Sequence, residues 1–199
     1  MSCHQLYWLN KSPHIAVFLN IFPEHLDYYK NIEEYAKAKA NITSHQTKKD
    51  YLVFNSEDKR VRKFSKTKAK NVSIDIKKIG NTVKIKDIPL KGDFNLKNVS
   101  AAIETAKILK IPSEKIAKAV KSFKPLKYRL ELVGKYKGIE FYSDALATIP
   151  EATMAAIDAL GKNVQTIMLG GFDRNIDFKN LAKKVLKSGI KNVILFPTT

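Results

Sequence analysis

Potential metal ligands and proton carriers are concentrated in one stretch near the N-terminus, residues 20–42. An apolar run at 15–21 is followed by Pro23, which predicts a buried strand that ends in a loop. Directly after this proline come three side chains able to bind a metal ion or transfer a proton, Glu24, His25 and Asp27. This loop is therefore a candidate site for a cation or for acid–base chemistry.

A lysine occupies an unexpected position on the helix that is predicted to follow. Asn31 is a suitable N-cap, and Glu33 and Glu34 in the first turn suit the helix dipole. Spacing of three and four residues places Lys39 on the same face as Tyr35 and its apolar neighbours. Because desolvating an ammonium group is costly, either the Lys39 side chain reaches the surface or burial favours its neutral, reactive amine.

A second candidate site is a pair of amides at the start of another predicted helix. Asn95 and Asn98 follow Gly92 and Asp93 closely. Asn95 can simply cap the helix. Alternatively, two amides three residues apart face the same side and could bind a purine edge or a phosphate, helped by the helix N-terminus. The spacing leaves both interpretations open.

Two loops that follow predicted strands are further candidates. Gly170 and Gly171 follow the strand pattern at 164–169, and residues 144–148 follow the pattern at 139–142. Ligands of α/β proteins commonly bind at the carboxyl ends of strands, although a glycine pair also serves as an ordinary turn. The sequence has no G-x-x-x-x-G-K-[ST] loop, so we expect no phosphate cradle of that kind.

The remaining histidines and the single cysteine carry little signal by themselves. His4, His14 and His45 have no ligand partner at useful sequence spacing, so we interpret them as structural or surface residues. Cys3 cannot form an internal disulfide, which fits a reducing, cytoplasmic location. No apolar run approaches membrane-spanning length, and the N-terminus lacks the pattern of a signal peptide. We expect no membrane insertion.

The chain is strongly basic, with a formal net charge of +17. Such a field attracts nucleic acid, acidic membranes or phosphorylated small molecules. The densest basic cluster, residues 59–70, contains seven Lys or Arg and only one aromatic residue, Phe64. This composition does not resemble a base-stacking platform, so we expect no nucleic-acid binding.

The hydrophobic pattern predicts an α/β protein with two domains. Strand patterns occur at 14–21, 51–55, 129–133, 139–142, 164–169 and 193–196. We expect the strands at 129–133 and 139–142 to pair around Gly138, and we expect a second hairpin from 71–76 and 82–88 around Gly80. Helix patterns occur near 31–42, 56–63 with Ser56 as its cap, 93–109, 112–123, 150–160 and 177–186. The expected buried stripe of the helix near 93–109 consists of Leu96, Val99, Ala102, Ile103, Ala106 and Leu109. Lys124-Pro125 resembles a linker, which predicts domains at 1–124 and 125–199. Strand–helix alternation in the second part predicts a parallel sheet covered by helices.

Several segments together resemble the Mur ligase family, and most closely its D-glutamate-adding branch. They match the family's motifs in order along the chain, from residue 2 to about residue 178, and read SCHQL, NIFPEHLDYY, EYAKAKANI, KGDFNLKNVSAA, YRLELVGKYKGIEFYSDALATIPEAT and GGFDRNIDF. The resemblance implies the second half of a central ATPase domain in 1–124 and the first half of a Rossmann-like C-terminal domain in 125–199. The family's N-terminal UDP-binding domain, its phosphate loop and its C-terminal end are outside the matched segments.

The resemblance also implies roles for individual residues. Lys39 matches the lysine that the family carries as a carbamate, and His25 matches a residue that helps to hold Mg²⁺. The ATP contacts are expected at Asn95, Asn98, Arg129 and Asp144. Thr148 and Arg174 match positions near the incoming D-glutamate. Ala145 and Leu146 depart from the family pattern, which weakens the glutamate contacts but not the ATP contacts.

The implied activity is the ATP-dependent addition of D-glutamate to UDP-N-acetylmuramoyl-L-alanine in peptidoglycan synthesis, through an acyl phosphate, with Mg²⁺ as cofactor. We expect a cytoplasmic monomer, and we expect this polypeptide alone to be inactive because it has no phosphate cradle. Two alternatives remain: another amino-acid ligase of the superfamily, such as folylpolyglutamate synthase, and a non-catalytic basic module that binds nucleic acid or another anion.

Overall fold

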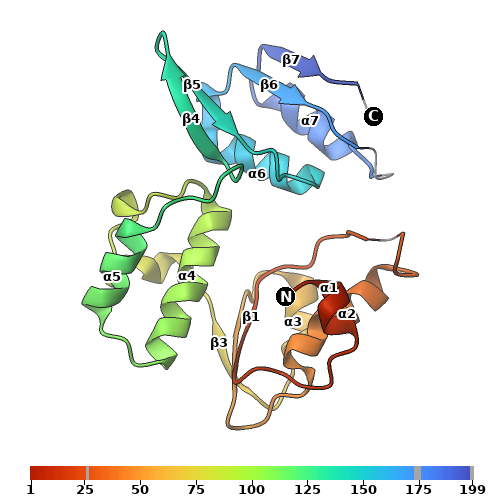
Figure 1. The fold of residues 1–199 in the computed structure, drawn as a ribbon, viewed down its shortest axis with the longest axis vertical. Coiled ribbons are helices and arrows are strands. Elements are labelled where there is room, and N and C mark those ends of the chain that lie inside the picture. Colours follow the sequence, from red (N-terminus) through yellow and green to blue (C-terminus); the bar gives the residue numbers. More distant parts are fainter. Residues whose placement is uncertain (26, 173–175, 198–199) are drawn as a thin grey trace. The chain divides into compact units, whose positions relative to one another are not determined.

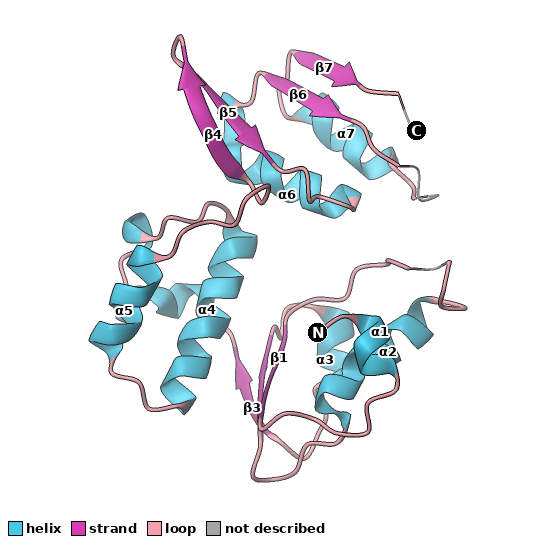
Figure 2. Cartoon of the chain, viewed as in Figure 1, coloured by secondary structure: helices cyan, strands magenta, loops and turns pink. Residues whose placement is uncertain are grey.

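The computed structural model describes residues 1–25, 27–172 and 176–197, which divide into two compact units (Figure 1). The first unit comprises Met1–Ile88 and Leu96–Ser122, and the second comprises Pro89–Asn95 and the chain from Phe123 onward. Each unit is an assembly of helices and strands (Figure 2). The fold is therefore of the mixed α/β class, as the sequence predicts.

A three-stranded parallel sheet forms the centre of the first unit. Its strands are β1 (Ile15–Phe18), β2 (Tyr51–Phe54) and β3 (Lys70–Ser73), in the order β1-β2-β3. The central strand β2 is buried on both faces, with Leu52 and Phe54 in one apolar cluster and Val53 in another. This is the pattern of a parallel sheet covered by helices on both sides.

Different helices contribute to the two faces of this sheet. The cluster around Leu52 includes residues of α1 (Cys3–Tyr7), α2 (Ile32–Ser44) and α3 (Lys59–Phe64). The cluster around Val53 includes Ala101 and Ile108 of α4 (Asp93–Ile108). The first unit also contains α5 (Ser113–Ser122). Tyr29, which follows the candidate loop, and α2, which carries Lys39, thus belong to the α1–α3 side.

The predicted hairpin at 71–88 is wrong. Residues Lys70–Ser73 form β3 and pair in parallel with β2, and the following residues form two short 3₁₀ helices, η1 (Ile76–Asn81) and η2 (Ile85–Asp87). The alternation of apolar residues arises because Ile79, Val83 and Ile88 are buried in these turns. It does not reflect pairing with a neighbouring strand.

Two details of the helices also differ from expectation. The helix expected from Ser56 begins at Lys59, and its N-cap is Asp58, whose carboxylate accepts from the backbone N–H groups of Arg60 and Val61 at 2.9 Å. Along α4, Val99 and Ile103 are buried as predicted, but Ala102 and Leu109 of the same predicted stripe are exposed. The sequence thus locates both helices correctly, but it misplaces the first residue of α3 and part of the buried face of α4.

The second unit contains two strand pairs and two α-helices. Strands β4 (Glu131–Tyr136) and β5 (Ile139–Ser143) form the predicted antiparallel hairpin around Gly138, whose φ of 82° suits glycine. Strands β6 (Thr166–Leu169) and β7 (Asn192–Leu195) pair in parallel, as predicted. The apolar core of this unit joins α6 (Pro150–Leu160) and α7 (Lys179–Lys187) to β6, and a short 3₁₀ helix, η3 (Gly161–Asn163), follows α6.

Within the part of the chain that the structure describes, no helix combines the length and apolar character that crossing a bilayer requires.

Candidate functional site

The N-terminus of α2 is built as the sequence predicts. The Asn31 side chain accepts from the Glu34 N–H at 3.0 Å. The Glu34 carboxylate accepts in turn from the Lys30 N–H at 2.8 Å and from the Tyr7 hydroxyl at 3.1 Å. These bonds fix the first turn of α2 and join it to the end of α1.

Lys39 lies on the core-facing side of α2, beside Tyr35. Tyr35 is only 1% exposed, Lys39 is half-buried and Lys37 is exposed. The Lys39 Nζ atom lies 5.2 Å from the centre of the Tyr35 ring, a distance suited to a cation–π contact. The packing predicted from helical spacing is thus confirmed, and the amine is held against an aromatic surface.

His25 approaches the same aromatic ring from the loop. Its imidazole centre lies 6.4 Å from the Tyr35 ring centre, and its Nε2 lies 3.9 Å from a carboxylate oxygen of Glu24. The backbone of His25 is left-handed, with φ of 57°, and its carbonyl accepts from the N–H groups of Tyr28 and Tyr29 at 3.0 Å. A non-glycine residue in this conformation costs about 1 kcal/mol, and such strain is often found at functional sites.

Buried phenols surround this loop. Burial is the main cause that raises the pKa of Tyr35, and the nearby Glu24 carboxylate and Cys3 thiol add to it. Burial is also the main cause that raises the pKa of Tyr29, and the neighbouring Cys3 raises it further. Both phenols are therefore neutral at physiological pH. Their rings form an apolar surface beside the loop, and each ring carries a hydroxyl group.

His4 is exposed, as interpreted from the sequence, but it has two potential metal ligands beside it. A ring nitrogen of His4, a ring nitrogen of His25 and the Sγ atom of Cys3 all lie within 4.8 Å of one another. The His4 and His25 rings meet edge to face at 5.0 Å between centres. No sequence spacing could reveal this, because the partner residue is 21 positions away. His14, in contrast, pairs with Asp50 at 2.8 Å.

In the second unit, Arg129 and Asp144 are brought together by three hydrogen bonds. Arg129 Nη1 donates to the Leu146 carbonyl at 2.8 Å, and Asp144 accepts from the Leu130 N–H at 2.9 Å. The Leu146 N–H donates to the Tyr128 carbonyl at 3.2 Å. Tyr128 and Leu130, on either side of Arg129, both have positive φ, at 61° and 48°. This junction joins the segment before β4 to the segment after β5.

The structure does not bring the remaining predicted site residues, Asn95, Asn98 and Thr148, into one cluster. The Asn95 amide donates to the Lys91 carbonyl at 2.8 Å, and Asn95 is the third residue of α4, so it is not the N-cap. Asn98 and Thr148 are exposed. Arg174 lies outside the described residues.

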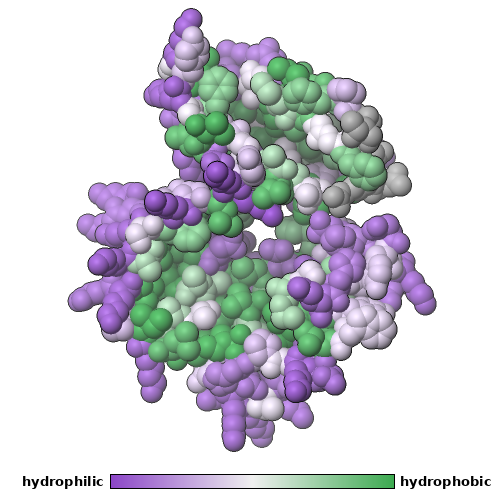
Figure 3. All heavy atoms as spheres, viewed as in Figure 1, coloured by the Kyte–Doolittle hydropathy of each residue, from purple (hydrophilic) through white to green (hydrophobic). Residues whose placement is uncertain are grey.

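An apolar groove lies between β1 and α4 in the first unit, and Figure 3 shows apolar side chains gathered on this face. Its lining comprises Val17, Leu19, Asn98, Ala101, Ala102, Thr105, Ala106, Leu109 and Ile111. Asn98 is the amide group among them, so this candidate residue stands beside an apolar surface that could accept one face of a flat ring.

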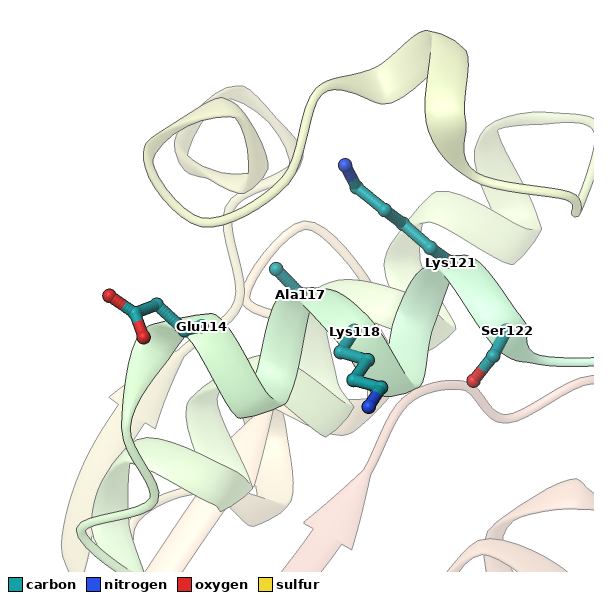
Figure 4. A pocket seen from close by; sticks show the side chains of 5 residues that line it. All are labelled: Glu114, Ala117, Lys118, Lys121 and Ser122. Atoms are coloured by element: carbon teal, nitrogen blue, oxygen red, sulfur yellow. The ribbon is translucent and has the colours of Figure 1, made fainter.

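A second hollow runs along α5 and is drawn in Figure 4. It is lined by Glu114, Ala117, Lys118, Lys121 and Ser122. The Lys121 ammonium forms a hydrogen-bonded ion pair with the Asp87 carboxylate at 2.9 Å. This hydrogen bond is the main cause that lowers the pKa of the Asp87 carboxyl. None of the residues predicted from sequence to be functional lines this hollow.

The glycine pair after β6 has a packing explanation. A Cβ atom at Gly170 would lie 2.6 Å from the Cβ of Phe196, so a side chain at this position would collide with its neighbour. Gly171 has a φ of 134°. Both glycines are therefore required by the local backbone and packing.

Comparisons with known proteins agree on one group of enzymes. Residues 1–87 match the Mur ligase middle domain. The chain is 35% identical to the UDP-N-acetylmuramoylalanine–D-glutamate ligase of Geobacillus kaustophilus over 217 aligned positions, which cover 100% of this chain and 48% of that protein. The chain spans about half the length of the curated relatives it matches.

Solved structures agree on the fold. The MurF ligase of Thermotoga maritima, in complex with ADP, superimposes with a TM-score of 0.71 at 16% identity, covering 93% of this chain and 49% of that one. A mutant of L. casei FPGS superimposes with a TM-score of 0.57 at 15% identity, covering 94% and 59%. The fold is thus that of the α/β ligases with a parallel central sheet. In sequence, residues 1–87 match the Mur ligase middle domain, and the whole chain is similar to about half of a named D-glutamate ligase.

Proposed function

We propose that this chain is part of an ATP-dependent ligase that adds D-glutamate to UDP-N-acetylmuramoyl-L-alanine in peptidoglycan synthesis. Residues 1–124 would contribute to the central ATP-binding domain and residues 125–199 to the C-terminal domain. The proposal is supported by the 35% identity with a named D-glutamate ligase along the whole chain. The observation that carries it is the position of Lys39, half-buried against Tyr35 on the side of the loop that holds His25.

In this proposal Lys39 acts as a carbamate. Only a neutral amine adds carbon dioxide, and the half-buried Lys39 amine lies beside the Tyr35 ring near His25. An amine and an imidazole alone are poor ligands for Mg²⁺, which prefers oxygen, whereas the carbamate supplies two anionic oxygens. Lys39 and His25 would therefore hold Mg²⁺, which neutralises phosphate charge when bound.

The proposed reaction has two steps, both carried by substrate atoms. The carboxylate of UDP-N-acetylmuramoyl-L-alanine attacks the γ-phosphorus of ATP, and ADP leaves as the acyl phosphate forms. The amine of D-glutamate then attacks the acyl carbon, the bond to phosphate breaks, and the amine proton is lost. In this scheme Asn95 and Asn98 bind the adenine side of ATP, and Arg129 and Asp144 contact ATP from the second unit.

The incoming amino acid would be oriented by residues of the second unit. Thr148 lies in the loop before α6, and Arg174 would pair with a carboxylate of D-glutamate through its planar guanidinium group. Because the sequence has no phosphate cradle, we expect no turnover from the 199-residue polypeptide by itself. We also propose that the enzyme is cytoplasmic and monomeric.

A segment-swapped enzyme tests this proposal. The aligned half of the Geobacillus kaustophilus ligase is replaced by residues 1–199, and ADP release is measured with UDP-N-acetylmuramoyl-L-alanine and a series of amino acids. We expect turnover with D-glutamate. Lys39→Ala should lower it by about 100-fold or more, because a preorganised charge contact is lost. The matched control Lys37→Ala, on the exposed face of α2, should leave turnover unchanged.

Two outcomes would contradict the proposal. The first is a swapped enzyme that unfolds cooperatively on heating, and is therefore folded, but has no D-glutamate-dependent turnover. The second is a preference for another amino acid or for a folate substrate, which would favour the folylpolyglutamate type of ligase, whose fold is also similar. Steep salt-dependent DNA binding by the chain would instead favour a non-catalytic basic module.

A further inference from the structure

Three potential metal ligands of a different chemical kind meet at the start of α1. They are the thiol of Cys3 and the ring nitrogens of His4 and His25, whose ligand atoms lie within 4.8 Å of one another. Thiolate and imidazole are ligands for Zn²⁺ and related transition metals, whereas Mg²⁺ prefers oxygen. The donor set therefore differs in kind from the oxygen-rich site proposed around the Lys39 carbamate.

A buried hydroxyl beside the cluster has no partner. Tyr29 is 2% exposed, and its Oη atom makes no hydrogen bond of normal geometry with any residue in the described part of the chain. A buried hydroxyl without a hydrogen-bond partner destabilises the folded chain, so it requires an explanation. The Tyr29 ring stacks on His4 at 5.7 Å, and Cys3 is the polar group that influences its hydroxyl most. A metal-bound thiolate at Cys3, or a water on the metal, would give this hydroxyl an acceptor.

Two of the three ligands, Cys3 and His4, belong to a helix that is held in place before any ion arrives. The Asn41 amide donates to the carbonyls of Leu6 and Tyr7, at 3.0 and 3.1 Å, which anchors the end of α1 to α2. A capping box between Ser2 and Gln5 fixes its start. Cys3 itself is buried at 3% exposure. Cys3 and His4 thus belong to a short helix that is anchored at both ends.

We propose that Cys3, His4 and His25 bind one Zn²⁺ ion, or a similar thiophilic divalent ion, with the fourth position open. Tetrahedral coordination at about 2.0–2.3 Å places ligand atoms about 3.3–3.7 Å apart, so the side chains close by about 1 Å on the ion. The Cys3 thiol gives up its proton as the sulfur–metal bond forms, and both imidazoles bind in the neutral form. The site shares His25 with the Mg²⁺ site of the proposed function, so the two ions would compete for this imidazole and Zn²⁺ bound here would exclude Mg²⁺ from it.

The purified 199-residue chain allows a direct test with Co²⁺ and Zn²⁺. We expect Co²⁺ to bind with one-to-one stoichiometry and to produce a thiolate-to-cobalt charge-transfer band, which Zn²⁺ displaces and a large excess of Mg²⁺ does not. Cys3→Ser should abolish the band. His4→Phe should weaken Zn²⁺ binding by more than about 100-fold, since even changes behind the ligands cost about 10- to 100-fold.

His45→Gln is the matched control, because His45 is an exposed histidine at the end of α2. It should leave both the band and the Zn²⁺ affinity unchanged. The proposal is overturned if Co²⁺ gives no thiolate band, if Cys3→Ser binds Zn²⁺ as tightly as the parent chain, or if His45→Gln weakens binding as much as His4→Phe. Circular dichroism of each variant verifies folding, and His4→Phe, at an exposed position, keeps the test decisive if Cys3→Ser does not fold.

Discussion

The ammonium nitrogen of Lys39 lies 5.2 Å from the centre of the Tyr35 ring, one turn earlier on α2. The imidazole of His25 lies near the same ring, at 6.4 Å between centres. Tyr35 is therefore the common neighbour of the two residues to which we assign metal binding. Tyr35 is itself almost completely buried.

Replacing Tyr35 should therefore affect stability strongly. We expect Tyr35→Ala to lower the free energy of unfolding by about 3–5 kcal/mol, the usual cost of removing a buried aromatic ring. Tyr28→Ala is the control, because Tyr28 is 58% exposed, and it should cost about 1 kcal/mol or less. Urea unfolding followed by circular dichroism measures both. Equal losses for the two variants would show that Tyr35 is not a core residue.

The start of α3 offers a comparison between two capping candidates. Asp58→Ala should destabilise the chain by about 0.5–2 kcal/mol, because its carboxylate satisfies two backbone N–H groups. Ser56→Ala should cost less, since the Ser56 hydroxyl bonds to the Ser73 hydroxyl at an exposed position and not to the N-terminus of α3 in the described part of the chain. Thermal or urea unfolding of the two variants measures which substitution lowers the stability more. A greater loss from Ser56→Ala would contradict this assignment of the cap.

Asp50 should make the stability of the chain depend on acid pH. Its pKa is lowered to about 2 by hydrogen bonds from the Thr47 backbone, from His14 and from the Thr47 side chain. Because the folded pKa lies below the unfolded one, the stabilisation is complete above about pH 4. It is lost as the pH falls toward 2.

The matched variant is Asp50→Asn, which removes the charge but keeps the size. Unfolding free energies of parent and variant, measured in urea from pH 7 to pH 2, should differ most above pH 4 and converge toward pH 2. A difference that grows as the pH falls would show that the sign of this linkage is wrong. A constant difference would mean that the carboxylate charge contributes nothing.

Local signals in the sequence were sufficient for most elements of the fold. Helical spacing placed Tyr35 and Lys39 on one face of α2, and Asn31 was correctly identified as its cap. The hairpin around Gly138 was also found from its turn residue. These features depend on residues that are close in sequence, which is why spacing and turn chemistry report them.

The errors concern relationships between distant residues. The pairing of β3 with β2 joins Val72 to Val53, 19 positions apart, and no local pattern distinguishes it from a hairpin. Similarly, Cys3 and His4 meet His25 only because α1 packs beside α2. In the second unit, Arg129 donates a hydrogen bond to the segment at 144–146. The residues on either side of it, Tyr128 and Leu130, have positive φ. Non-glycine residues rarely adopt this conformation, so the sequence did not predict the contact.

The most direct test of the central claim is whether Lys39 carries a carbamate. Carbon-13 NMR of the segment-swapped ligase, equilibrated with ¹³C-labelled bicarbonate and Mg²⁺, should show a carbamate resonance that disappears in Lys39→Arg and persists in Lys37→Arg. A spectrum without a carbamate resonance, or one that Lys39→Arg leaves unchanged, would contradict the account.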